Sequence, residues 1–473
     1  MKRIKLSLLF VLLAVCTVFG QQAKYVFYFI GDGMGVNQVQ GTELYLGELE
    51  GKIGITPLQF TQFPYSTVAT TFSATNGVTD SAAAGTALAT GHKTKNGAIG
   101  VLKDLSTPVS SVAVWAQKAG KKVGIATSVS VDHATPAAFY AHEGSRGNAY
   151  GIGKDLITTG FDFYAGSDFV DPNNSENKDS QSESLYSLVE KEGYTIARGY
   201  KDYQKKAKKA NKMILFQPEE ASQKDNSAIP YAIDRKKTDL TLCDITRSAI
   251  NFLNKDTEKG FFLMVEGGKI DWACHANDAA TVFQEVIDFD NAIKVAYEFY
   301  AQHPDETLIV VTADHETGGL ALGCGPYALN LQVLKNQKLS QGGFTTVMKD
   351  LRNKNKNGIS WEQVKKALEE NFGFWKSVSL TEKQEARLKA VYEKNKKGAS
   401  EMTASEYQSD DPIGAVAKEI INEIALVNWA SGGHSAGYVP VFAIGAGAEN
   451  FQGRIDNTEI PVKIAKAAGY TVE

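Results

Sequence analysis

Five short apolar segments, rich in β-branched and aromatic residues, recur along the chain and predict buried β-strands. Segments with helical spacing lie between them. The predicted strands are Lys24–Ile30, Lys121–Val131, Phe261–Val265, Thr307–Thr312 and Val439–Ile444. Strands that are apolar throughout are buried on both faces. The alternation therefore favours an α/β fold in which helices sandwich a doubly wound, mostly parallel sheet.

Helices are predicted between these strands. Residues 107–119 place Thr107 at the capping position and Pro108 at the first helical position. One long helix is expected from about Asp271 to Tyr300, because apolar residues recur there every three or four positions.

Residues 327–411 are rich in Lys, Asn and Gln and predict a helical cap inserted between two core strands. Ser360 with Gln363, and Thr381 with Gln384, have the spacing of capping boxes. We expect this insertion to belong to one catalytic domain that spans residues 21–473.

The N-terminal residues predict a signal peptide over residues 1–20. MKRIK supplies positive charge, and LSLLFVLLAVCTVFG is short for a membrane span. The mature chain is then expected to be exported to the periplasm, without stable membrane association. Secretion is a weaker alternative. A lipid anchor on Cys16 is weaker too, because Val15 is bulky for the position before a lipidated cysteine.

Composition narrows the classes of function. The 473 residues carry a formal net charge of -4 and are 43% hydrophobic, as in ordinary globular proteins. This balance predicts no nucleic-acid partner. Beyond the signal peptide, Cys243, Cys274 and Cys324 are widely spaced and odd in number, which predicts free thiols rather than a disulfide framework.

Side chains that bind metal or phosphate follow four of the five predicted strands. They are Asp32, His133 with Thr135, Glu266 with Asp271, and Asp314 with His315. In doubly wound sheets, ligands bind outside the carboxyl ends of the strands. We therefore expect these residues to gather at one edge of the sheet.

Three histidines and several aspartates fit a two-metal site with ligands suited to Zn²⁺. Asp271 and His275 stand four residues apart, so both can lie on one face of a helix. Asp314–His315 lie in a Gly-flanked turn, and His434 lies in SGGHSAG. Two cations about 4 Å apart suit in-line displacement at phosphorus.

Such a site needs a nucleophile and a group that holds phosphate oxygens. The stretch VTDSAAAGTALATG either forms an ordinary capped helix or presents Ser81 as a nucleophile at a helix N-terminus, where the dipole attracts an anion. Arg146 is a candidate for phosphate because a guanidinium matches it in a bidentate way. A surface arginine is the alternative.

Six motifs, in this order and spacing, resemble the alkaline phosphatase family. They are GDGMG, VTDSAAAGTALATG, DHATPAAFYAHEGSR, VEGGKIDWACHAND, VTADHETGG and GGHSAG. The resemblance covers about Lys24 to Gly325 and resumes near Trp429, which leaves the insertion outside it. It implies an alkaline phosphatase that releases inorganic phosphate from small phosphate monoesters. A homodimer is compatible with it, because relatives are commonly homodimers.

The resemblance also implies the roles of individual residues. Ser81 would attack the ester and form a phosphoserine, while Arg146 holds the phosphoryl oxygens. One Zn²⁺, which deprotonates the serine, would bind Asp32, Asp314 and His315. A second Zn²⁺, which stabilises the leaving alkoxide, would bind Asp271, His275 and His434. One Mg²⁺ would bind Asp32, Thr135 and Glu266.

Two positions vary within the family. His133 stands where several bacterial members have Asp, close to the third site, so that Zn²⁺ or Co²⁺ can compete there with Mg²⁺. Trp272 stands where other members have Lys or His near the phosphate. Without an ammonium at that position, we expect weaker phosphate binding and faster release.

Two other functions stay open. A sulfatase or phosphodiesterase could use the same fold, although DSAAAG lacks the C/S-x-P-x-R pattern, and diesterases generally lack the arginine and the third metal. An exported, non-catalytic binder of phosphate or metal is the other alternative, against which the intact Ser81 argues.

Overall fold

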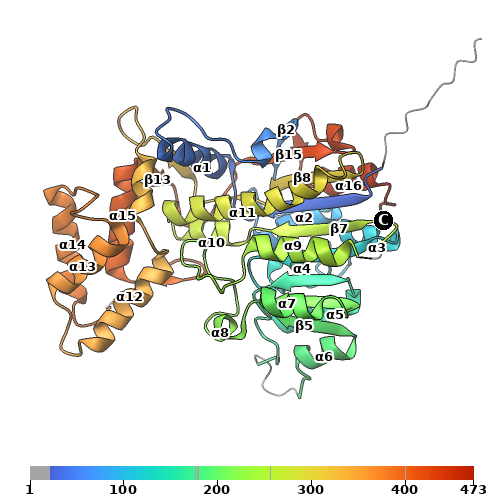
Figure 1. Cartoon of the computed structure of the whole chain (residues 1–473), viewed down its shortest axis with the longest axis horizontal. Coiled ribbons are helices and arrows are strands. Elements are labelled where there is room, and N and C mark those ends of the chain that lie inside the picture. Colours follow the sequence, from blue (N-terminus) through green and yellow to red (C-terminus); the bar gives the residue numbers. More distant parts are fainter. Residues whose placement is uncertain (1–21, 176, 178–180, 256, 400) are drawn as a thin grey trace, which may run out of the picture.

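The computed structural model describes residues 22–175, 177, 181–255, 257–399 and 401–473. The predicted signal peptide, with Cys16, lies outside the described residues. A ten-stranded sheet occupies the centre, with helices on its two faces (Figure 1). Its strands, in spatial order, are β16 (Ile455–Asp456), β2 (Tyr65–Thr70), β15 (Val439–Gly445), β8 (Thr307–Ala313), β1 (Tyr25–Gly31), β7 (Phe261–Glu266), β3 (Lys122–Thr127), β4 (Phe163–Gly166), β6 (Lys212–Phe216) and β5 (Tyr194–Arg198).

The sheet is mostly parallel, as the apolar segments predict. The seven strands from β8 to β5 run parallel, whereas β15 runs antiparallel to both of its neighbours, β8 and β2. Every residue of β1, β7 and β8 is buried. Both faces of these strands are therefore covered, and the predicted doubly wound α/β class is confirmed.

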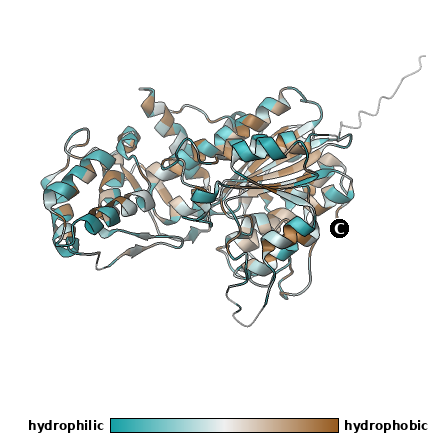
Figure 2. Cartoon of the chain, turned by 60° about the horizontal axis from the view of Figure 1, so that its bottom comes forward, coloured by the Kyte–Doolittle hydropathy of each residue, from teal (hydrophilic) through white to brown (hydrophobic). Residues whose placement is uncertain are grey.

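Helices cover the sheet in two layers. The helices outside the insertion are α1 (Val36–Leu49), α2 (Ser81–Thr90), α3 (Val112–Lys118), α4 (Ala134–Ala137), α5 (Ala149–Thr159), α6 (Leu185–Lys191), α7 (Tyr200–Lys206), α8 (Glu219–Ser222), α9 (Leu242–Leu253), α10 (Lys269–His275), α11 (Ala279–Tyr300), α15 (Pro412–Ala425) and α16 (Glu459–Ala468). Helices α9 and α11 pack against each other, and α16 packs against α2 and α3. Figure 2 shows the hydrophobic strands in the middle and more hydrophilic positions on the outer helices.

The region 327–411 forms a helical lobe at one end of the molecule, next to α15 (Figure 1). It contains α12 (Gln341–Lys354), α13 (Trp361–Phe372) and α14 (Glu382–Asn395). Both predicted capping boxes are present, at the starts of α13 and α14. After α14 the chain forms a short hairpin of β11 (Thr403–Ala404) and β12 (Ser409–Asp410), which the sequence did not predict.

The helix predicted over residues 107–119 begins later than expected. Helix α3 starts at Val112, and Ser111 is its cap, with Oγ accepting from the amide of Val114 at 3.2 Å. Thr107 does not cap it, because its hydroxyl donates to Oδ2 of Asp104 at 2.5 Å in the preceding turn. The cap prediction for Thr107 was wrong because this nearer acidic acceptor competes for it.

The long helix predicted from Asp271 to Tyr300 is two helices, α10 and α11. Asn277 between them has a φ of 52°, a left-handed conformation that ends α10. Asp278 then caps α11 by accepting from the amide of Thr281 at 3.2 Å. The two helices are therefore separate.

Two further features concern the described residues. Cys243, Cys274 and Cys324 are free thiols, as predicted. Among the helices that the structure describes, none combines the length and the apolar composition needed to cross a membrane.

Candidate active site and metal centre

The predicted site residues gather at the carboxyl edge of four neighbouring strands. In the sheet, β8, β1, β7 and β3 are consecutive. Asp314 and His315 follow β8, Asp32 follows β1, Glu266 ends β7, and His133 and Thr135 follow β3. Residues from distant parts of the sequence therefore meet at one edge, as expected for this fold.

The turn after β1 depends on Gly33. Its φ is +70°, and a Cβ at this position would lie 2.8 Å from Cα of Asp271. Its amide donates to Oδ1 of Asp314 at 3.1 Å. A side chain here would separate α10 from the turn that carries Asp32, which explains the glycine at the centre of GDGMG.

Ser81 is the first residue of α2, and it is fully buried. Asp80, not Ser81, caps this helix, by accepting from the amide of Ala83 at 3.0 Å. Gly91 ends the helix in the left-handed conformation. Because Asp80 fills the capping role, the Ser81 hydroxyl is left for another contact, and its Oγ lies 3.2 Å from Nε2 of His315.

Asp32, Asp314 and His315 form a first group of candidate ligands, with one donor atom of each within 4.8 Å of the others. Nε2 of His315 lies 3.4 Å from Oδ1 of Asp32 and 3.4 Å from Oδ2 of Asp314. Burial, followed by the charge of His434, holds the pKa of His315 well below its ordinary value. The neutral imidazole keeps a lone pair for a cation.

Asp271, His275 and His434 form a second group within the same distance. Nε2 of His275 lies 3.3 Å from Oδ2 of Asp271 and 3.1 Å from Nε2 of His434. Nδ1 of His275 is 2.6 Å from the carbonyl of Gly432, and Nδ1 of His434 is 2.8 Å from the carbonyl of Thr79. These carbonyls orient both rings so that Nε2 faces the group.

Asp32, His133 and Glu266 form a third group, so Asp32 belongs to two groups. Oγ1 of Thr135 lies 3.4 Å from Oδ2 of Asp32, and Thr127 donates to the Glu266 carboxylate. Burial is the main cause that raises the pKa of Glu266 to about 8. The group combines carboxylate and hydroxyl oxygens with one imidazole.

The chemistry of these groups fits bound cations. Among the described residues, Oδ1 of Asp32, Oε1 of Glu266 and Oδ2 of Asp271 are buried without a hydrogen-bond partner. Burial and repulsion from Asp314 raise the pKa of Asp32 well above its ordinary value. Adjacent buried carboxylates with free lone pairs are stabilised when a dication lies among them.

Arg146 points toward these groups rather than into solvent. Its Nη1 lies 3.4 Å from Oδ2 of Asp80, and its Nη2 lies 3.3 Å from Nε2 of His133. The hydroxyl of Tyr407 accepts from Nη2 at 3.4 Å. Trp272 stacks on Tyr407, with ring centroids 4.4 Å apart and planes 8° apart.

The sequence did not indicate three side chains at this site. Glu406 and Tyr407 come from the turn of the β11–β12 hairpin, and Oε2 of Glu406 lies 3.3 Å from Nε2 of His275. Nothing in the spacing of SEYQ marks them. Lys269 in VEGGKID is the first residue of α10, two residues before Asp271, and a lysine after an apolar strand was a usable signal.

Comparisons with known proteins agree with this geometry. The chain matches the alkaline phosphatase family over residues 23–155 and 203–470, which includes the insertion that the motifs alone left outside. It is 33% identical over 455 residues to alkaline phosphatase 3 of Bacillus subtilis, covering 96% of this chain and 90% of that protein.

Solved structures give the same result. The cold-active alkaline phosphatase of a psychrophilic Shewanella superposes with a TM-score of 0.78 at 29% identity, covering 94% of this chain and 99% of that one. A mutant of the TAB5 alkaline phosphatase with Mg bound in its M3 site superposes with a TM-score of 0.65 at 28% identity, covering 95% and 99% of the two chains. The chain therefore belongs to the alkaline phosphatase family, whose members are metal-dependent phosphomonoester hydrolases.

Proposed function

We propose that this enzyme hydrolyses small phosphate monoesters through a covalent phosphoserine on Ser81. The observation that carries the proposal is the buried Ser81 hydroxyl, 3.2 Å from Nε2 of His315. His315 in turn stacks on His434, with ring centroids 3.7 Å apart. The nucleophile therefore contacts the first group of candidate ligands, which itself packs against the second group.

The reaction divides into two displacements at phosphorus. In the first, a bond forms between Ser81 Oγ and phosphorus while the ester bond to the alcohol breaks. In the second, water attacks the phosphoserine, releases inorganic phosphate and restores Ser81. Arg146 holds the phosphoryl oxygens throughout, and His133 and Trp272 border the phosphate.

Three cations are part of the proposal. Asp32, Asp314 and His315 would hold one Zn²⁺, and Asp271, His275 and His434 would hold another. Asp32, Thr135 and Glu266 would hold Mg²⁺, and magnesium occupies the M3 site of a TAB5 variant in which a histidine is replaced by glutamate. The adjacent His133 lets Zn²⁺ or Co²⁺ compete for that site. Bound Zn²⁺ would supply charge that stabilises the attacking and leaving oxygens.

Substitution of Ser81 tests the covalent mechanism. We expect Ser81→Ala to lower kcat on p-nitrophenyl phosphate by at least about 10³-fold. Ser248→Ala is a matched control, because Ser248 is also fully buried but lies on α9. Undiminished hydrolysis by the Ser81 variant would exclude the phosphoserine. Faster turnover of bis-p-nitrophenyl phosphate than of the monoester would exclude the monoesterase assignment.

The organisation of the chain is also proposed. We infer that residues 1–20 direct export to the periplasm, because a basic start precedes an apolar stretch. Residues 327–411 form an insertion in the single domain that spans 21–473. Assembly as a homodimer is compatible with the family, and the elution volume of the purified enzyme measured with light scattering would test it.

A further inference from the structure

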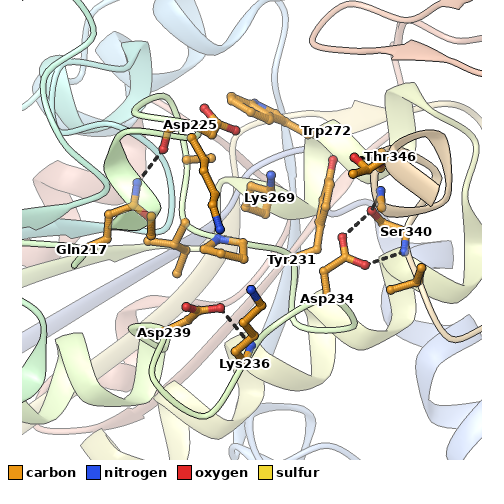
Figure 3. Close-up of a pocket in the computed structure, with 18 of the residues that line it drawn as sticks. Gln217, Asp225, Tyr231, Asp234, Lys236, Asp239, Lys269, Trp272, Ser340 and Thr346 are labelled. Atoms are coloured by element: carbon orange, nitrogen blue, oxygen red, sulfur yellow. Dashed lines mark hydrogen bonds between the residues drawn. The ribbon is translucent and has the colours of Figure 1, made fainter. Parts of the chain in front are cut away.

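A cavity of about 670 Å³ lies beside the proposed phosphate site. Trp272 and Tyr407, the stacked pair next to Arg146, form part of its wall. Pro218, Ile229 and Tyr231 add apolar and aromatic surface. Figure 3 shows Lys269 in the middle of this cavity, between Trp272 and Tyr231. The cavity and the phosphate site thus share the Trp272–Tyr407 wall.

Among the residues that the structure describes, the ammonium of Lys269 forms no direct ion pair, and the charges of Glu285, Asp225 and Asp234 reach it only from beyond ion-pair distance. Its residue is only 4% exposed, and its Nζ lies 3.5 Å from the ring centroid of Tyr231 and 4.6 Å from that of Trp272. Among the described residues, no carboxylate lies within 4.0 Å of this Nζ, and no hydrogen-bond acceptor contacts it. Two ring faces replace only part of the hydration that burial removes, so an anion here would be stabilising.

Four carboxylates line the cavity, those of Glu220, Asp225, Asp234 and Asp239, and the three aspartates accept hydrogen bonds from other groups of the protein. Asp234 accepts from the amide of Ser340 at 2.8 Å and also from its hydroxyl. Asp225 accepts from the amide of Ser227 at 2.9 Å, and Asp239 accepts from the amide of Lys236 at 2.8 Å. Figure 3 shows the Asp234–Ser340 and Asp239–Lys236 contacts away from Lys269.

We propose that this cavity binds an organic anion, with the Lys269 ammonium as its counter-ion and the aromatic and proline side chains around its carbon skeleton. A carboxylate or a second phosphoryl group has the required chemistry. The surface suits an anion attached to an apolar body better than a free inorganic ion.

The shared wall indicates which anion this is. A substrate whose phosphoryl group lies at Arg146 can extend past Trp272 into the cavity. The class of substrate is then a phosphate monoester whose alcohol carries a second anionic group. This assignment rests on the proposed phosphomonoesterase function. A separate organic anion is the other source of the same chemistry.

A pair of substrates that differ only in terminal charge tests the proposal. We would measure kcat/KM for a carboxylate-terminated hexyl phosphate and for its terminal amide, with the metal-loaded enzyme. The kcat/KM for the carboxylate ester divided by that for the amide ester should fall about tenfold in Lys269→Gln. The same ratio should recover largely in Lys269→Arg. Lys237→Gln is the control, because Lys237 is exposed, lies near the cavity and does not line it.

Calorimetric titration of the same enzymes with hexanoate distinguishes the source of the anion. A ratio that falls assigns the cavity to the substrate. An unchanged ratio with weaker hexanoate binding in Lys269→Gln assigns it to a separate anion. If neither quantity changes, the anion site is excluded. Failure to hydrolyse the amide-terminated ester would instead exclude the proposed function, and the titration would still report on the cavity.

Discussion

The hydroxyl of Tyr407 lies 3.4 Å from Nη2 of Arg146, although Tyr407 belongs to the helical insertion and Arg146 to the loop after α4. The β11–β12 hairpin therefore extends from the lobe to the edge of the sheet that carries the candidate ligands. Its tyrosine accepts a hydrogen bond from the arginine that we assign to phosphate.

Tyr407→Phe is expected to raise KM for p-nitrophenyl phosphate about three- to tenfold with a smaller change in kcat, because Arg146 loses one acceptor that positions it. Steady-state kinetics measure both constants. Tyr392→Phe is the matched control, because the Tyr392 hydroxyl donates to the carbonyl of Ile359 within the lobe. Equal changes of KM in the two variants would mean that Tyr407 acts only through the stability of the lobe and not through Arg146.

Trp272→Lys is expected to tighten competitive inhibition by phosphate about tenfold, because an ammonium attracts the dianion and an indole does not. The inhibition constant against p-nitrophenyl phosphate measures this. Trp272→Phe keeps an aromatic ring against Tyr407 without adding charge, so it separates the charge from loss of stacking. An unchanged constant in the lysine variant would contradict the expectation.

Chelation is expected to abolish activity and to lower Tm together. Without cations, the buried carboxylates of Asp32 and Asp314 lie close together, and burial and mutual charge raise the pKa of Asp32. We would add back Zn²⁺ alone, or Zn²⁺ with Mg²⁺ or Co²⁺. Activity assays and scanning calorimetry would then measure the recovery of turnover and of Tm. Full activity after exhaustive chelation would contradict the proposed roles of the three groups.

Stability should fall as pH rises through about 7 because of Glu285. This residue of α11 is buried, and burial raises its pKa to about 7 from an ordinary 4.5. A raised folded-state pKa contributes stability that is fully present below 4.5 and is lost as pH rises through 7, at most about 3 kcal/mol. Glu285→Gln should therefore raise Tm by about 2–5 °C at alkaline pH and much less under acidic conditions.

Calorimetry at acidic and alkaline pH tests this expectation. Gln can still accept from the amide of Ala232, which now donates to Oε1 of Glu285 at 2.5 Å. Glu298→Gln, on an exposed position of the same helix, is the control and should shift Tm by about 1 °C or less. A Tm gain of Glu285→Gln that is the same at both pH values would show that removal of the charge is not its cause.

Apolar continuity predicted the central strands well. β1, β7 and β8 begin and end within one residue of the predicted limits. β3 ends at Thr127, four residues before the predicted Val131, and beyond it Val129 forms only an isolated bridge with Ala228. Local spacing predicts helix caps less well where another polar partner competes for the capping side chain, as Asp104 does for Thr107.

The candidate site was predictable where its residues follow strands. Asp32 and His315 needed only the rule that parallel strands end at one edge. Tyr407 could not be predicted in this way, because its position depends on how an irregular hairpin returns from the lobe. Lys269 could have been noticed as a lysine that follows an apolar strand, but sequence spacing does not indicate whether such a buried charge has a partner.

The strand order that builds the site also determines when the site can exist. Neighbours β8, β1, β7 and β3 come from widely separated parts of the chain, and His434 lies close to the C-terminal strand β15. Closing such large loops is slow and has to precede any catalysis. Recovery of activity during refolding should therefore lag behind the early gain of helical signal, and turnover becomes a reporter of the fully assembled sheet.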